Sequence, residues 1–151
     1  MTSNPFELKP HHLGVSVADL EASIAWYRDM LGFSLYLRSN LPAAQAKVAH
    51  IKNGDFLIEL FEVSGAAPLP DSRRYPNRDL ATHGTKHIGF AVRNVSELRD
   101  NLKKRGVEIA MEKPLFIRDN SGNCCCGSIA GYCNHIKSNR TNSGHSFQFF
   151  N

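Results

Sequence analysis

A six-residue pattern that occurs twice constrains the fold more than any other feature of this 151-residue chain. His12–Val17 reads HLGVSV, and 75 residues later His87–Val92 reads HIGFAV. In both copies the residues alternate between an apolar face and a face of small or polar residues that begins with the histidine. Alternation with a period of two is typical of a β-strand that buries one face. A repeat of this kind predicts two copies of one structural unit.

A helix is expected after each of these strands. In the first copy Asp19 is a natural N-cap and Gly32 a natural stop, with an apolar stripe between them formed by Leu20, Ile24, Tyr27 and Leu31. In the second copy Asn94 and Glu97 have the spacing of a capping box, and Gly106 ends the helix. Trp26 and Tyr27 are expected to pack in the core rather than to touch a ligand.

Three further strands are expected in each unit. The apolar runs that predict them are 33–37, 46–52 and 56–63 in the first unit, and 107–111, 115–118 and a last strand after the turn at 119–123 in the second. We therefore expect one α+β domain over 1–151, built from two tandem βαβββ modules. The modules span 10–63 and 87–133, with a linker at 64–86 and an atypical polar tail at 134–151.

The turn Asn53-Gly54 is a strong hairpin signal between the second and third of these strands in the first unit. A two-residue loop at these positions would pair Lys52 with Asp55, His50 with Leu57 and Val48 with Glu59. His50 would then share a face of the sheet with Glu59. A slip of one residue would reverse that face.

Composition excludes several classes of protein. No apolar run approaches the roughly 20 residues of a membrane helix, and the N-terminus lacks a signal-peptide core, so a cytoplasmic protein without membrane contact is expected. The net charge of +4 includes Arg73, Arg74 and Arg78, which lack the interleaved aromatic residues of a nucleic-acid surface. These arginines are either solvated or in contact with a small acidic ligand. Cysteines at 124, 125, 126 and 133 do not form a regular disulfide framework.

The candidate site begins with the repeated histidines. His12 and His87 occupy the same place in two copies of one unit, and neutral imidazoles on converging strands suit a divalent metal. Glu59 is the best third donor, because it interrupts the apolar run FLIELF, where an acidic residue is costly unless it is paired or metal-bound. A single histidine taken alone is more often a satisfied core or surface group. The repeat and Glu59 together favour the metal interpretation.

Four segments carry a resemblance to a known family: HLGVSVADLEASIAWYRDMLGF, LIELFE, HIGFAV and IRDNSGN. They resemble the vicinal oxygen chelate superfamily, which includes glyoxalase I, bleomycin- and fosfomycin-resistance proteins, methylmalonyl-CoA epimerase and extradiol dioxygenases. The resemblance covers about 10–123. It implies a glyoxalase-like fold, in which paired βαβββ modules form a cupped mixed sheet around one divalent metal ion (Zn, Mn, Fe or Ni). His12, Glu59 and His87 match three of the family's metal ligands.

The fourth ligand departs from the family pattern. The family has a glutamate three residues after the turn at 119–123, and here Cys124, Cys125 and Cys126 follow instead. Three interpretations stay open. The reading frame has changed after Asn123; Cys126 is a genuine thiolate ligand that favours zinc; or the metal keeps three protein ligands or is not bound. The last strand of the second module is therefore expected to be atypical.

The resemblance implies a metal-dependent lyase, isomerase or dioxygenase that acts on a small molecule with two vicinal oxygens. The metal would stabilise an enediolate-like oxyanion as a Lewis acid, and Glu59 would move the proton. His50, Arg73, Arg74 and Arg78 are candidate substrate contacts. Two alternatives remain: a resistance-type protein that binds a small molecule or antibiotic without chemistry, and a degenerate member that lacks the fourth ligand. A homodimer is plausible, because half-sheets of this architecture often complete each other between chains.

Overall fold

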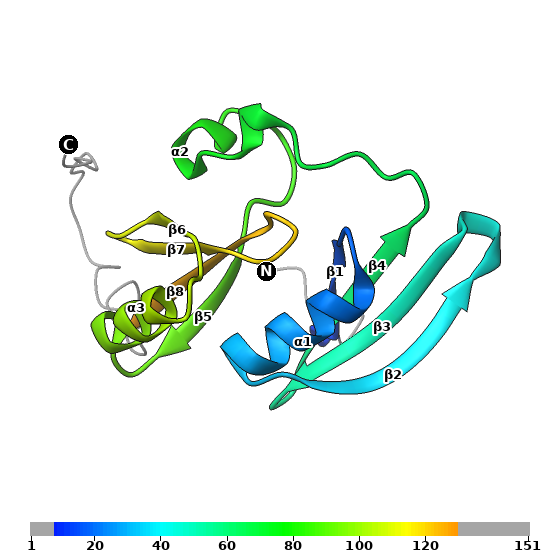
Figure 1. Cartoon of the computed structure of the whole chain (residues 1–151), viewed down its shortest axis with the longest axis horizontal. Coiled ribbons are helices and arrows are strands. Elements are labelled where there is room, and N and C mark those ends of the chain that lie inside the picture. The colour runs from blue at the N-terminus through cyan, green and yellow to red at the C-terminus, as the bar shows by residue number, and fades with distance from the viewer. Residues whose placement is uncertain (1–7, 130–151) are drawn as a thin grey trace, which may run out of the picture.

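The computed structural model describes residues 8–129, which form two four-stranded sheets of identical topology (Figure 1). The first sheet contains β1 (His12–Ser16), β2 (Ser34–Leu41), β3 (Ala46–Asn53) and β4 (Phe56–Val63) in the order β1-β4-β3-β2. The second contains β5 (Ile88–Val92), β6 (Ile109–Met111), β7 (Leu115–Arg118) and β8 (Cys124–Ile129) in the order β5-β8-β7-β6. The first and last strands of each set are parallel and the other pairs antiparallel. The α+β fold of tandem βαβββ modules is confirmed.

The closing strand of the second sheet is formed by β8, although its sequence is unusual. This strand pairs with β5 on one side and with β7 on the other. The predicted tail at 134–151 lies outside the described residues, as do the end of the second predicted module at 130–133 and Cys133.

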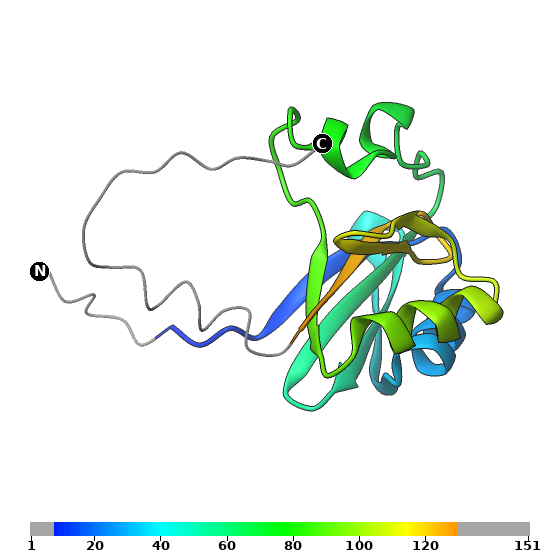
Figure 2. The same ribbon diagram turned by 90° about the vertical axis from the view of Figure 1, so that its left-hand side faces the viewer.

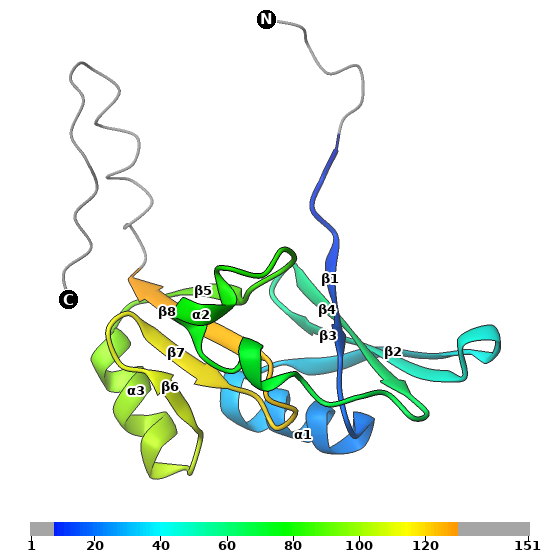
Figure 3. The same cartoon turned by 90° about the horizontal axis from the view of Figure 1, so that it is seen from above.

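Two helices cover the same side of the two sheets, as the views from the side and from above agree (Figures 2 and 3). Helix α1 (Leu20–Leu31) begins after Asp19, whose side chain accepts a hydrogen bond from the Ala22 amide at 2.8 Å. It ends at Gly32, which has a φ of 71° that suits glycine. Helix α3 (Val95–Lys104) begins after Asn94, whose side chain accepts from the Glu97 amide at 3.1 Å. The predicted caps are confirmed.

One hydrophobic core spans both modules. Buried side chains from α1 and the first sheet pack in the same cluster as buried side chains from α3 and the second sheet: Tyr27, Ile58 and Leu60 with Leu102, Leu115 and Cys125. The loop at 119–123 adds polar links between the modules. The Tyr27 hydroxyl donates to Asp119 Oδ2 at 3.0 Å, and Asn123 Nδ2 donates to the Ser16 carbonyl at 3.0 Å. These contacts fix the two modules of one chain against each other.

The predicted linker at 64–86 contains two short helical turns, η2 (Asp71–Arg73) and α2 (Pro76–Asp79). Asp79 is buried and accepts from Arg73 Nε at 2.8 Å and from Lys86 Nζ at 3.2 Å. This ion pair ties the end of α2 to the segment that leads into β5. In Figure 1 the segment with α2 lies above β6 and β7. A further turn, η1 (Pro42–Ala44), joins β2 to β3.

The predicted register of the β3–β4 hairpin is wrong. Asn53 pairs with Phe56 and His50 pairs directly with Glu59, so the two loop residues are Gly54 and Asp55. The reason is conformational: the positive φ of 57° that the loop requires falls on its first residue, where glycine has no steric penalty. His50 and Glu59 still share one face. Two strand lengths also differ, because β2 extends to residue 41 and β6 begins only at residue 109.

Within the described part of the chain, no helix has both the length and the apolar character needed to cross a membrane.

Candidate metal centre

The first half of the site lies on the face of β1, β3 and β4 that turns away from the helices. The register places Glu59 beside Gly14 of β1 and beside His50 of β3. His12 Nε2 lies 3.2 Å from Glu59 Oε2, and His50 Nε2 lies 3.5 Å from Glu59 Oε1. Within residues 8–129 these two imidazoles are the only ion-pair partners of Glu59, whose side chain is 20% exposed.

The spacing of these atoms fits a metal-binding pair. Nitrogen and oxygen donors about 2.1 Å from one ion lie roughly 3.0–3.4 Å from each other. The separation of 3.2 Å between His12 Nε2 and Glu59 Oε2 falls in this range. A carboxylate and imidazoles are also the donor types that divalent transition metals take. His50 Nδ1 is buried without a hydrogen-bond partner in the described part of the chain, so this histidine is not fully satisfied by the protein.

The second half of the site has an equivalent register. Gly89 of β5 pairs with Cys126 of β8, as Gly14 of β1 pairs with Glu59 of β4. His87 precedes Gly89 by two residues, as His12 precedes Gly14. Cys126 is therefore the structural counterpart of Glu59. The His87 ring packs edge-on against Phe116, with 5.0 Å between the ring centroids.

The glycine of each repeat is explained by a side chain that packs over it from the neighbouring strand. A Cβ at Gly14 would lie 3.1 Å from a ring carbon of Phe61, which is closer than nearly all such contacts. A Cβ at Gly89 would lie 3.4 Å from Cys126 Sγ. The missing Cβ of Gly14 thus leaves room for Phe61 of β4, and that of Gly89 leaves room for Cys126 of β8.

The three consecutive cysteines face alternate sides of β8. Cys125 is fully buried in the core, whereas Cys124 and Cys126 lie on the opposite face, so the run cannot chelate one ion. Burial raises the pKa of Cys125 to about 12 and that of Cys124 to about 11, although the Arg118 charge opposes the latter. Burial also raises the pKa of Cys126. These thiols are protonated at neutral pH, and metal binding by Cys126 would have to release a proton.

The predicted ligands are divided between the two modules. His12 and Glu59 belong to the first sheet, whereas Cys126 belongs to the second and His87 directly precedes its strand β5. No group of three or more histidine, cysteine, aspartate or glutamate side chains in residues 8–129 is placed to hold a metal ion. The structure brings His12 and His50 to Glu59, and within the described residues His87 does not join them in a group placed to hold an ion.

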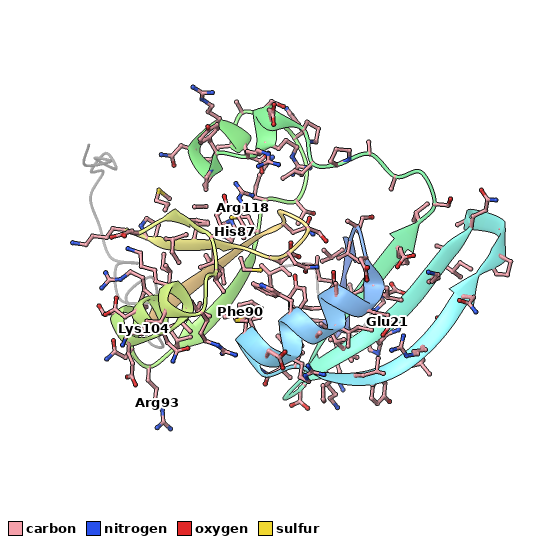
Figure 4. All side chains as sticks on the ribbon, in the orientation of Figure 1. Glu21, His87, Phe90, Arg93, Lys104 and Arg118 are labelled. Atoms are coloured by element: carbon pink, nitrogen blue, oxygen red, sulfur yellow. The ribbon has the colours of Figure 1, made fainter. Side chains whose placement is uncertain are left out.

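The three predicted substrate-contacting arginines lie in the segment before β5, and each has a local partner. Arg73 pairs with Asp79, Arg74 Nε lies 3.3 Å from Asp71, and the Arg78 guanidinium lies 5.0 Å from the centre of the Tyr75 ring. Arg118 was not predicted from the sequence; it is buried at the end of β7 beside His87 (Figure 4). The signal was a charged residue ending the apolar run LFIR, comparable to Glu59 in FLIELF.

Comparison with known proteins agrees with this architecture. Residues 9–123 match the model of the Glyoxalase/Bleomycin resistance protein/Dioxygenase superfamily. The chain belongs to this superfamily, which confirms the resemblance seen in its motifs.

The chain is similar to relatives in sequence and to solved structures in fold. The uncharacterized protein YaeR of Escherichia coli (strain K12) is 30% identical over 99 residues, which cover 65% of this chain and 71% of YaeR. The trypanothione-dependent glyoxalase I of Leishmania major superposes with a TM-score of 0.70 at 20% identity, covering 87% of this chain and 93% of that one. A glyoxalase family protein from Bacillus cereus gives 0.64 at 20% identity, with coverages of 86% and 99%. At such identities the structural matches show a shared fold.

Proposed function

We propose that this chain is a metal-dependent enzyme of the superfamily, acting on a small molecule with two neighbouring oxygen atoms. His12 and Glu59 would supply one pair of metal ligands, and His87 and Cys126 the other. The observation that supports this most directly is the partly buried Glu59 carboxylate, which faces imidazoles from two neighbouring strands and has no lysine or arginine partner within residues 8–129. A carboxylate in such surroundings is costly unless a cation compensates it.

The residues around Glu59 suggest how a proton is handled. A bound divalent metal would supply Lewis-acid stabilisation for a developing oxyanion. Glu59 can accept a proton at its carboxylate, and His50 Nε2 is 3.5 Å from Oε1, close enough to pass that proton on after a small movement. Leu57 and Phe61 flank Glu59 on the same face of β4, and Leu57 is buried. These side chains limit the access of water to the carboxylate.

The two ligand pairs would come together between two copies of the chain. β1 and β5 are edge strands, each hydrogen-bonded on one side only within the described residues. Edge strands can pair with or lie beside strands of another chain. In a symmetric dimer His12 and Glu59 of one copy would face His87 and Cys126 of the second copy, which forms two equivalent sites.

Complementation between variants tests this arrangement. Glu59→Gln and His87→Gln each remove a ligand from a different pair, so each variant alone should lose stoichiometric Zn²⁺ or Mn²⁺ binding. When the two variants are unfolded and refolded together, mixed dimers contain one intact site, and about a quarter of all sites should bind metal. Metal content after gel filtration measures the recovery. A mixture that binds no more metal than its components would refute the shared site.

A binding protein without chemistry is the second candidate, and Cys126 favours it. The position equivalent to Glu59 holds a thiol whose pKa burial raises, so the fourth donor is weaker at neutral pH than a carboxylate would be. A protein that sequesters a small molecule tolerates a missing donor more easily than an enzyme does. Loading the purified chain with Zn²⁺, Mn²⁺, Fe²⁺ and Ni²⁺ separates the two functions. Retention of none of these metals would exclude the enzyme and leave the binding protein.

A further inference from the structure

A cavity of about 660 Å³ lies beside His87 on the second sheet. Its wall includes Arg73, Asp79, Lys86, His87, Arg118 and Cys124. A second cavity of about 280 Å³ shares these six residues and also touches Gly14 and Ser16 of β1. The open space thus reaches from the edge of the first sheet to His87 beside the second sheet. Figure 4 shows His87 and Arg118 together beneath the segment that holds α2.

The charges around this space do not balance. Asp79 is 5% exposed, and its carboxylate is shared by Arg73 Nε at 2.8 Å and Lys86 Nζ at 3.2 Å. Arg118 adds a third cation and has no carboxylate within 4.0 Å among residues 8–129. With Lys113, which also lines the larger cavity, four cationic side chains therefore face one carboxylate. An excess of positive charge around a confined space attracts anions.

Arg118 also has unused hydrogen-bonding capacity. The residue is 4% exposed, and Nη1 donates to the Gly122 carbonyl at 2.9 Å. Nη2 is buried and has no hydrogen-bond partner in the described part of the chain. A buried guanidinium donor without an acceptor is destabilising. A planar or tetrahedral oxyanion is the acceptor that best matches a guanidinium, because it can take two parallel N–H bonds.

The sheet register places Arg118 in line with Cys124 and His87. Arg118 pairs with Cys124, and Ile88 pairs with Cys125, so His87 is level with Cys124. Arg118, Cys124 and His87 therefore form a row across β7, β8 and the start of β5. Cys126 lies one step further along the same face of β8. A ligand whose anionic group contacts Arg118 would place its remaining atoms near His87 and Cys124, which line the same cavities.

We propose that Arg118, assisted by Lys86 and Arg73, binds the carboxylate or phosphate group of a small molecule. As a subsite for the substrate this site rests on the proposed function above. The binding of the oxyanion itself does not depend on that function, because cationic side chains of this chain would bind the oxyanion without a metal. The site therefore defines the ligand as an anion, whatever chemistry follows.

Calorimetric titration of the metal-free protein tests this site. Inorganic phosphate and malonate are titrated separately in a chloride buffer with EDTA, and at least one should bind with one equivalent per chain. Phosphate binding alone points to a phosphorylated ligand, and malonate binding alone to a carboxylic acid. Replacement of Arg118 by glutamine should raise the dissociation constant by about tenfold or more, because a charge-assisted hydrogen bond is lost.

A matched pair of surface variants controls for folding and for net charge. Lys113 and Lys104 are both exposed, but only Lys113 is among the residues that line the cavity. Lys113→Glu should weaken binding several-fold, and Lys104→Glu should leave it unchanged. This pair of variants tests whether the anion binds in the cavity even if the Arg118 variant fails to fold.

Three results would overturn the oxyanion site. They are no binding of either anion up to about 20 mM, equal weakening by both lysine variants, or a folded Arg118→Gln protein that binds like wild type. In the first case a water molecule satisfies Nη2 instead. A chain that binds phosphate but no divalent metal would retain the oxyanion site and lose the metal-dependent function. The opposite result would remove the oxyanion site alone.

Discussion

Removal of the Tyr27 hydroxyl should loosen the contact between the two modules. This hydroxyl donates to the buried Asp119 carboxylate at 3.0 Å, and Tyr27 itself is fully buried. Burial, with the nearby Cys125 and Asp119, raises the pKa of Tyr27 well above its usual value, so the hydroxyl keeps its proton and remains a donor. Tyr27→Phe deletes the donor and leaves the ring contacts with Trp26 and Phe33 in place. The variant therefore isolates one hydrogen bond.

The expected loss is about 1.5 kcal/mol of unfolding free energy. Hydrogen bonds to charged groups contribute roughly 1.5–3 kcal/mol. The lower end applies, because Asp119 keeps bonds from the Ser121 amide at 2.9 Å, the Asn123 amide at 2.8 Å and Asn123 Nδ2 at 3.1 Å. For a domain of this size a loss of 1.5 kcal/mol lowers Tm by roughly 3–6 °C.

Urea unfolding followed by circular dichroism measures this change, with Tyr36→Phe as the control. Tyr36 is 63% exposed on β2, so its variant should change stability by less than about 0.5 kcal/mol. A single transition is expected in both, because one core spans the modules. If Tyr27→Phe is as stable as Tyr36→Phe, the hydroxyl does not hold the modules together.

Two further outcomes concern Asp79 and Cys126. The Arg73 hydrogen bond, aided by Lys86, lowers the pKa of Asp79. The stability that this pairing contributes is therefore present above the ordinary aspartate pKa of about 4, and it disappears as pH falls through the lowered pKa. Asp79→Asn should cost about 3 kcal/mol at pH 7 and remove part of the acid dependence of Tm between pH 2 and 5; an unchanged acid profile would contradict this. Cys126→Glu should tighten Mn²⁺ binding on the order of tenfold, because a carboxylate is ionised at neutral pH and suits a hard cation. Unchanged affinity in metal titrations would place Cys126 outside the site.

Local sequence signals predicted much of the fold. The alternation in HLGVSV and HIGFAV, the caps Asp19 and Asn94, and the stop at Gly32 depend on residues close in the chain, and the structure bears them out. The β3–β4 register was missed, because the Asn53-Gly54 signal allows the loop to start at either residue. Only the conformation of Gly54 decides between them.

The division of the candidate ligands between the two modules could not be predicted from local sequence patterns. It depends on how the modules pack, and the contacts that fix them join residues far apart in the chain. Tyr27 and Asp119 are separated by 92 positions, and Asn123 is 107 positions from Ser16. Arg118 was overlooked for a similar reason. Its position at the end of an apolar strand was visible, but its nearness to His87 follows from the pairing of β8 between β5 and β7.

The cysteine run shows how the second module can keep its fold while its site chemistry differs. Backbone hydrogen bonds hold β8 between β5 and β7, and this pairing does not depend on the side chain at position 126. The buried face of β8 requires an apolar side chain, and Cys125 fits there because a buried free cysteine behaves as a small apolar residue. On the outer face Cys126 stands opposite Gly89 as Glu59 stands opposite Gly14. If the proposed site binds one ion, imidazole and carboxylate would come from one module and imidazole and thiol from the other, and the thiol would favour zinc over manganese.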